Sequence, residues 1–461
     1  MDPQVIQSYL VEYICSLSWK TSQAAPIVNA LKDLKLSTED LSLLTDKVFV
    51  CCGSSELQNI PALVYQLLLV SMQGKGDQAL KGIAKLFEGM EKAWSAPGAS
   101  KVPLLAVEGT VLLQINIVAK QKQELGHNLI KSLKEDFSPL KPFLFGMLLS
   151  LARISRCEKQ VFDYLQDAVL LYFSKLTGEC DAPDDLVNEV VSRSHHWDIT
   201  IQSFVQFGKS LIKSSSAITS KGLVAILADT AKERQKPRLR RVLLGVDILL
   251  KLFESHDAVR SDILKQCQQE ILNNSSCSIF YTHLLARLCI QCRTAVMEYS
   301  TLVKECLDCF LIISPKVALY CFISILPLLL CKPDLKNYSV IVLRKAMFSR
   351  DYNHRYTALK CLMHLALADT LPDFVSTSQS HACFSQQSQS QRSSVGEICN
   401  DLLGFLRKGL KQQYSLRKVL YSGFTELAQL KPDLGLKAME VSHLLSFYFP
   451  LSLRKEMCLM N

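Results

Sequence analysis

The sequence contains few of the residues that make turns. It has 18 glycines and 15 prolines in 461 residues, and no long run alternates apolar with polar side chains. Turn-rich β architectures need both features, so the composition argues against them. Charged residues make up 21% against 49% hydrophobic, which leaves ample apolar surface to bury. A chain of this length exceeds one hydrophobic core, so it must form several domains or one extended repeat array.

Features that would place the chain in a membrane are also scarce. The longest apolar run, Val317–Cys331, has 15 residues and contains Pro327. A bilayer-spanning helix needs about 20 apolar residues. The first residues, M-D-P-Q-V-I-Q-S-Y, lack the basic and apolar regions of a secretory signal. The 17 cysteines are scattered through apolar segments, which indicates reduced core residues of an intracellular protein. We expect no membrane partner.

Motifs that carry catalysis are absent. No H-E-x-x-H or G-x-S-x-G sequence occurs, and Gly74-Lys75-Gly76 lacks the rest of a phosphate-binding loop. His195-His196 has no acid or cysteine at a spacing that suggests a catalytic group. We therefore predict that the chain is not an enzyme and binds no cofactor, because helical arrays mostly supply binding surface.

Two cysteine pairs have the spacing of a zinc site. Cys289 and Cys292 form one pair, and Cys306 and Cys309 form the other. Zinc knuckles need tight turns beside the cysteines, whereas no Gly or Pro stands near these pairs. We predict core cysteines one helical turn apart on apolar faces and no metal. A zinc- or thiol-dependent enzyme is the alternative, which bound metal or a reactive cysteine would reveal.

Apolar residues at helical spacing are what the sequence has in abundance. They form segments of about 12–18 residues separated by short polar or Gly/Pro breaks. Helices joined by short turns pack as antiparallel hairpins, so we predict an all-α, irregular α-solenoid of HEAT or armadillo type with an interposed helical domain. The predicted helices cover residues 60–72, 78–94, 102–120, 124–134, 143–154, 159–176, 199–212, 242–253, 258–272, 277–289, 294–313, 316–330, 335–348, 354–368, 395–406, 414–430 and 434–448.

Basic residues gather in two places, although the net charge of +9 is mild for this length. Lys131 and Lys134 are three residues apart and share one face of a predicted helix. A second cluster, Lys232–Arg241, could form a phosphate-contacting loop or a weak nuclear-import signal. A solvated helix face is the simpler interpretation of both. If they bind DNA, the contacts should be to backbone phosphates and should weaken with salt.

Ser-Gln pairs cluster after Pro372. The chain has five such pairs, and four of them begin at Ser378, Ser385, Ser388 and Ser390. The surrounding segment is too polar to bury a core, so we predict a disordered linker. Damage-checkpoint kinases of the phosphatidylinositol-3-kinase-like class select Ser or Thr before Gln, which favours a phosphorylation switch over a polar spacer. Each phosphate adds about −1.5 to −2 charges.

Lys345 stands alone in the apolar segment V-I-V-L-R-K-A-M-F, residues 340–348. On a helical wheel it lies between Ile341 and Val342, with Phe348 one turn later. A helix that is apolar nearly all round is either buried within the array or covered by a partner.

Several motifs in a fixed order resemble one family, the Fanconi anaemia complementation group I family. They are V-L-R-K-A-M-F followed by the Ser-Gln cluster, I-P-A-L-V-Y-Q-L-L at residues 60–68, V-E-G-T at 107–110, E-L-G-x-x-L-I-K-x-L-K at 124–134 and H-x-W-D around Trp197. The resemblance covers roughly residues 20–450. Family members are much longer, so it implies that an N-terminal cap and a C-terminal solenoid with a DNA-binding tail are missing here.

The resemblance implies a nuclear protein, chromatin-associated after damage, that pairs with the Fanconi group D-two paralogue. The pair clamps double-stranded and branched DNA at interstrand crosslinks. Lys345 matches the lysine that the Fanconi core ubiquitin ligase and its conjugating enzyme modify, and Ser378 matches a phosphoserine of the regulatory cluster. Lys131 and Lys134 match lysines of the DNA-binding groove. The competing interpretation is a generic α-solenoid adaptor or transport protein without damage regulation.

The same resemblance divides the chain into five parts. Residues 1–122 would be the first helical solenoid, 123–197 a helical domain, and 198–370 a second solenoid that carries Lys345. Residues 371–395 would be the Ser-Gln linker, and 396–461 the start of a second helical domain.

Overall fold

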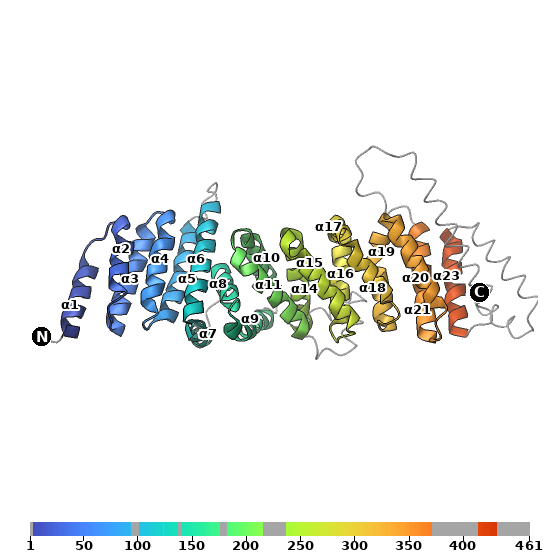
Figure 1. Cartoon of the computed structure of the whole chain (residues 1–461), viewed down its shortest axis with the longest axis horizontal. Helices are drawn as coiled ribbons and strands as arrows, with labels where there is room; N and C mark the ends of the chain where they lie inside the picture. Colours follow the sequence, from blue (N-terminus) through green and yellow to red (C-terminus); the bar gives the residue numbers. More distant parts are fainter. Residues whose placement is uncertain are drawn as a thin grey trace, which may run out of the picture. The chain divides into compact units, whose positions relative to one another are not determined.

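The computed structural model shows a series of α-helices, and where the connections are described they are short (Figure 1). It describes residues 3–93, 101–122, 124–136, 140–175, 182–214, 237–370 and 414–430. Over these ranges there is no β-strand. The predicted all-α fold class is therefore confirmed, and the chain divides into two compact units, Met1–Arg260 and Ser261–Asn461. The division into five parts stays a prediction.

The first unit is a stack in which each helix packs against the helix two positions later. Thus α1 packs on α3, α2 on α4, and so on to α7 on α9, while neighbours such as α3 and α4 also touch. This alternation is that of stacked antiparallel hairpins, the architecture of an α-solenoid (Figure 1). The helices are α1 (Pro3–Ser16), α2 (Thr21–Leu31), α3 (Thr38–Ser54), α4 (Ile60–Ser71), α5 (Gly76–Ala93), α6 (Val102–Gln121), α7 (Glu124–Asp136), α8 (Pro142–Ala152), α9 (Ser155–Lys175), α10 (Ala182–Arg193), α11 (Asp198–Lys213) and α14 (Pro237–Ser255), with 3-10 turns η1 (Leu57–Asn59) and η2 (Ser194–His196).

The second unit repeats this alternation. Here α16 packs on α19, α19 on α21 and α21 on α23, while α18 packs on α20 and α20 also packs on α19 and α21. The helices are α16 (Ser278–Gln291), α17 (Arg293–Glu298), α18 (Ser300–Asp308), α19 (Pro315–Cys331), α20 (Pro333–Met347), α21 (Tyr352–Thr370) and α23 (Tyr414–Leu430); α15 (Asp257–Leu272) spans the boundary between the units.

Proline and capping residues fix several helix starts. Proline stands in the first turn of α4, α6, α8, α19 and α20, where its missing N–H has no intrahelical partner in any case. Ser37 begins α3 with a reciprocal capping box, because its hydroxyl accepts from Asp40 N while Asp40 accepts from Ser37 N. The proline signals explain why the predicted starts of α4, α6, α8, α19 and α20 lie close to the observed ones, whereas the capping box of α3 was not used in the prediction.

Four observed helices were missed by the sequence prediction and one predicted helix is divided. The predicted helices begin at residue 60, so α1, α2 and α3 have no predicted counterpart. The predicted helices over residues 395–406 and 434–448 lie outside the described residues. Helix α10 was not predicted, although Val187, Val190 and Val191 occupy the i, i+3 and i+4 positions of a buried face. The predicted helix over residues 294–313 is two helices, α17 and α18, that meet at Tyr299. No Gly or Pro marks that break, and the residue after it, Ser300, accepts a hydrogen bond from Lys332 Nζ at 3.1 Å.

Helix α6, with 20 residues and a high mean hydropathy, is long and apolar enough to cross a membrane. Its surroundings give the simpler explanation. It packs between α4 and α8 and buries a hydrogen-bonded amide, since Asn116 Nδ2 donates to the Ser150 carbonyl at 2.6 Å. A helix in a protein core can have the same length and hydropathy.

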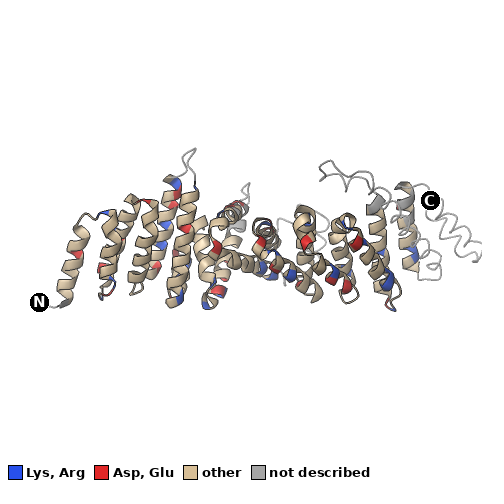
Figure 2. Ribbon diagram, turned by 45° about the horizontal axis from the view of Figure 1, so that its top comes forward, with Lys and Arg blue, Asp and Glu red and all other residues tan. Residues whose placement is uncertain are grey.

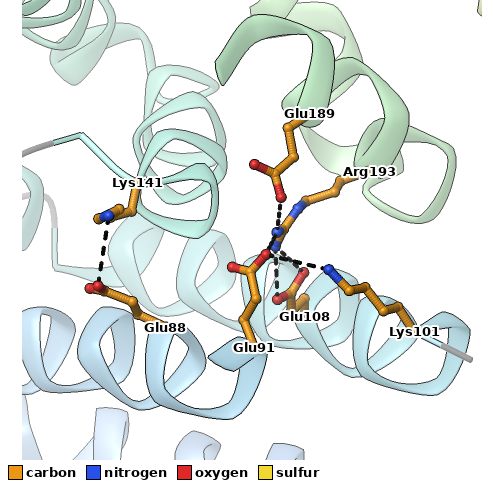
Figure 3. A network of polar contacts seen from close by, with 7 residues as sticks. All are labelled: Glu88, Glu91, Lys101, Glu108, Lys141, Glu189 and Arg193. Carbon is orange, nitrogen blue, oxygen red and sulfur yellow. Dashed lines mark hydrogen bonds and ion pairs between the residues drawn. The ribbon is translucent and has the colours of Figure 1, made fainter. Parts of the chain in front are cut away.

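A buried ionic cluster joins α10 to α5 and α6. Arg193 lies 5% exposed between Glu91, Glu108 and Glu189, and its Nη1 is 3.3 Å from the Glu108 carboxylate (Figure 3). Glu108 is fully buried, so burial raises its pKa to about 7 although Arg193 opposes the shift. The cluster fixes α10 in place, because each carboxylate comes from a different turn or helix and all converge on one guanidinium.

Close backbone approach at Gly109 reinforces this junction. A Cβ at Gly109 would lie 2.1 Å from the His196 carbonyl oxygen, so only glycine fits here. The buried Trp197 side chain packs nearby, where a Cβ on Gly146 would meet its ring at 2.6 Å. The two motifs V-E-G-T and H-x-W-D, which are far apart in the sequence, therefore meet in the fold.

Candidate functional site

Lys345 lies in the last turn of α20. The position of the buried face of α20 determines the direction of the Lys345 side chain. Leu335, Leu343 and Ala346 are fully buried where α20 packs on α18, α19 and α21. In an α-helix these positions share one face, which puts Lys345 on the opposite side. Lys345 is exposed. Of the two environments predicted for this helix, burial within the array is wrong for the face that carries Lys345.

Large apolar side chains flank Lys345 on this outer face. Ile341, one turn earlier, is 61% exposed, and Phe348, almost one turn later, is 70% exposed. Large apolar side chains that are exposed beside a lysine are typical of an interaction surface and not of a solvated face. The lysine stem can follow the apolar surface while its ammonium group stays in water.

Hydrogen bonds order the chain around Lys345. Its carbonyl accepts from Phe348 N at 3.2 Å, which closes the helix end. Arg355 Nη1 then donates to the carbonyls of Ser349 and Arg350 at 2.8 and 2.9 Å. The positive charges of Arg344 and Lys345 in the last turn also favour the helix dipole. The amine of Lys345 therefore stands on a defined helix end.

Tyr338 connects the outer face of α20 to α18. Its hydroxyl donates to the Asp308 carboxylate, and Lys304 Nζ lies 5.7 Å from its ring centroid. The hydrogen bond to Asp308 raises the pKa of Tyr338. No pattern in the sequence indicates this contact, because the two residues are 30 positions apart.

Lys131 and Lys134 lie on the exposed face of α7. The opposite face buries Leu125, Leu129 and Leu133 against the array. Among the described residues neither lysine has an ion-pair partner. Unpaired ammonium groups on one helix face suit contacts to phosphates.

Neighbouring helices hold α7 from two sides. On one side Lys81 of α5 donates to the Ser132 carbonyl at 3.1 Å and pairs with Asp136. On the other side His127 hydrogen bonds Gln160 of α9. Basic and acidic residues are interspersed along the helices (Figure 2), and α7 itself also carries Glu124, Glu135 and Asp136. The basic character is therefore confined to Lys131 and Lys134.

Of the remaining predicted positions, the structure describes only some. Ser378, Ser385, Ser388 and Ser390 lie outside the described residues. So does the first half of the basic cluster, while its second half forms the first turns of α14 and not a loop. Burial and the charge of Arg238 lower the pKa of Arg241 there, and Asp167 opposes them.

The cysteine pairs straddle helix ends. Cys292 and Cys309 are the C-cap residues of α16 and α18, while Cys289 and Cys306 are buried in those helices. Burial raises the pKa of the Cys289 and Cys306 thiols, which disfavours the thiolate that zinc requires. Within the part of the chain that the structure describes, no group of three His, Cys, Asp or Glu side chains could hold a metal ion.

Comparisons with known proteins cover nearly the whole chain. Four family models match in order: FANCI solenoid 1 over residues 4–120, FANCI helical domain 1 over 124–181, FANCI solenoid 2 over 200–363 and FANCI helical domain 2 over 375–454. The chain is 29% identical to the Fanconi anemia group I protein of Gallus gallus over 98% of its length. That alignment covers 36% of the relative. It is 28% identical to the homologue of Mus musculus over 96% of its length.

Among solved structures, one from the Pds5–Scc1 complex aligns with 94% of this chain and 66% of its own, at 12% identity and a TM-score of 0.34. The chain spans about a third of the length of the curated relatives that it matches. With four consecutive matching domains on the predicted helical fold, the chain belongs to the Fanconi anaemia group I family.

Proposed function

We propose that this chain is a non-enzymatic scaffold of the Fanconi DNA-repair pathway whose Lys345 accepts a single ubiquitin. The observation that carries the proposal is the exposed position of Lys345 on an ordered helix end, between the exposed side chains of Ile341 and Phe348. A conjugating enzyme needs an accessible amine, and apolar neighbours provide the contact area that a modifying complex or a partner can bury.

The apolar outer face of α20 also supports a protein partner. We assign it to the Fanconi group D-two paralogue, which would cover Ile341 and Phe348 in a heterodimer. Damage-checkpoint kinases would phosphorylate Ser378, Ser385, Ser388 and Ser390 and so regulate the modification of Lys345 in the nucleus, on chromatin after damage. The Fanconi core ubiquitin ligase with its conjugating enzyme would supply the ubiquitin.

The test is mass spectrometry of the chain from cells before and after treatment with a DNA crosslinker. A ubiquitin remnant should appear on Lys345 after treatment and vanish in the Lys345→Arg variant. Lys316→Arg is the matched control, because Lys316 is exposed in the first turn of α19 and should leave the modification unchanged. An unmodified Lys345 in both conditions would favour the generic adaptor without damage regulation.

The DNA contact proposed for α7 has its own test. Lys131 and Lys134 would contact backbone phosphates of double-stranded or branched DNA, so the contact carries no sequence preference. Replacing both by Gln should lower the slope of log K against log salt by about 2, since each phosphate contact contributes roughly 0.9. Fluorescence anisotropy with duplex DNA at several salt concentrations measures this, and an unchanged slope would exclude α7 as the contact.

A further inference from the structure

A groove opens between α21 and α23 in the second unit, with a cavity of about 420 Å³. No pattern in the sequence indicates this groove, because residues 371–413 separate the two helices. Its walls are formed by side chains four residues apart on each helix, hence on one face of each. They are Tyr356, Lys360 and His364 of α21 and Tyr414, Lys418 and Ser422 of α23.

The two helices run parallel along the groove. Tyr352 donates to Ser415 Oγ where both helices begin, and Gly423 packs on Met363 further along both. A Cβ at Gly423 would lie 2.3 Å from Met363 Cε, so the helices approach closely below the groove. Because they run in the same direction, the tyrosine and lysine side chains of the two walls lie at the same end.

That end of the groove is cationic and carries aromatic rings. Lys360 Nζ is 4.8 Å from the Tyr356 ring centroid, which holds this ammonium group over the wall. Lys418 and Tyr414 on the opposite wall are exposed. The only carboxylate among the residues that line the groove is Glu426, two helical turns beyond Lys418. Two ammonium groups with phenol hydroxyls beside them form a suitable site for a phosphate group.

The charges of the groove influence one another. The pKa of His364 lies below its usual value because of partial desolvation and the charge of Lys360, while Glu426 opposes the shift. Lys360, His364 and Glu426 therefore lie within electrostatic range of each other. The carboxylate is at the far end of the groove, so an anion would bind beside the lysines and away from Glu426.

We propose that this groove binds the phosphorylated Ser-Gln segment of the same chain, with a phosphoserine between Lys360 and Lys418. The proposal rests on the phosphorylation proposed above and adds the site that would recognise it. The groove lies between the two helices that bracket the Ser-Gln cluster, since α21 ends at Thr370 and α23 begins at Tyr414.

The length of chain permits this contact. Ser378 is eight residues beyond Thr370, and eight extended residues span at most about 29 Å. Lys360 is ten residues before Thr370, or about 15 Å back along the helix. A phosphate on Ser378 can therefore reach Lys360 without unwinding α21. The same arithmetic leaves room for the serines further along the cluster.

The experiment measures binding of a synthetic peptide of residues 376–392, with and without phosphate on its four Ser-Gln serines, to the full unphosphorylated chain. We expect the phosphopeptide to bind at least about tenfold more tightly than the plain peptide, because charge-assisted hydrogen bonds are added. The double variant Lys360→Glu, Lys418→Glu should lose this preference. The control variant Lys316→Glu, on a lysine of the same unit outside the groove, should keep it.

Two results would contradict the proposal that this groove binds the phosphorylated segment. One is equal binding of the phosphopeptide by the double variant and the parent chain, which would place the contact on another basic surface. The other is the absence of phosphate-dependent binding. A circular-dichroism melt of each variant shows whether it folds, and Tyr414→Ala, at a 57% exposed position, provides a second variant that keeps the lysines.

A competition experiment decides whether the phosphorylated segment binds to the groove of its own chain. A chain phosphorylated on the four serines should bind the added phosphopeptide at least about tenfold more weakly than the unphosphorylated chain, because its groove is already filled. Equal binding would contradict binding within one chain. None of these measurements involves Lys345 or cellular kinases, so the groove and the proposed function can fail separately.

Discussion

The α10 junction and the outer face of α20 use charge in opposite ways. At the junction, Arg193 contacts Glu91, Glu108 and Glu189; Arg193 and Glu108 are removed from water, while Glu91 and Glu189 stay partly exposed. On α20, Lys345 is exposed and its neighbours Ile341 and Phe348 are apolar side chains that remain in water. The junction pairs its buried charges with one another, and the outer face of α20 leaves apolar surface exposed to water.

This difference separates positions that stabilise the fold from positions that are available for binding. Removing one member of a buried ionic cluster leaves uncompensated charge, which destabilises the fold strongly. Changing an exposed side chain leaves the free energy of unfolding nearly unchanged. Substitutions at the junction should therefore change stability, and substitutions on α20 should change binding and modification alone.

Arg193→Ala should have the largest effect on stability. It leaves three carboxylates facing each other around an empty position, so we expect a loss of about 3–5 kcal/mol in the free energy of unfolding. Denaturant unfolding followed by circular dichroism measures it. The control is Lys101→Ala, whose 3.9 Å pair with Glu91 is half-exposed and should contribute less than about 1 kcal/mol. A similar loss in both variants would contradict the role assigned to burial.

Glu108→Gln should alter how stability depends on pH. Burial raises the folded pKa of Glu108 from 4.5 to about 7, so the fold favours its protonated form. Its stabilising contribution is present below about pH 4.5 and is lost as the pH rises through 7. Glutamine stays neutral, so the variant should gain stability relative to the parent between pH 5 and 8, by roughly 3 kcal/mol.

Melting temperatures of both proteins across that pH range provide the measurement. A constant difference between the parent and the Gln variant would show that Glu108 stays ionised in the fold. In that case Arg193 would outweigh burial at this site.

Ile341→Ser with Phe348→Ser should have the smallest effect on stability, because both side chains are more than half exposed. We expect a change in unfolding free energy within about 0.5 kcal/mol. Binding to the D-two paralogue and ubiquitin transfer to Lys345 should nevertheless fall strongly. Pull-down of the paralogue and a ubiquitination assay on the purified chain test this. Normal binding by this variant would remove the α20 face from the interface.

Local pattern explains which features could be predicted. The helix over residues 414–430 was predicted with the observed bounds, because its apolar spacing and its ends are local properties. The contact between Glu108 and Arg193 joins residues 85 positions apart, and no local pattern encodes it. The exposure of Lys345 stayed open for a related reason: Ile341 and Leu343 are both large apolar residues, and only packing against α18, α19 and α21 decides which is buried.

The packing of each helix on the helix two positions later has a consequence for how the chain is made. Every such contact closes within two or three helices, so this part of the packing forms between segments that are near in the sequence. The Arg193 junction, which joins α10 to α5 and α6, is an exception. Emerging from the ribosome, α1 to α3 can dock before α10 has been synthesised, and later helices can add to an existing edge. The Arg193 junction would then form late and stabilise helices that are already stacked.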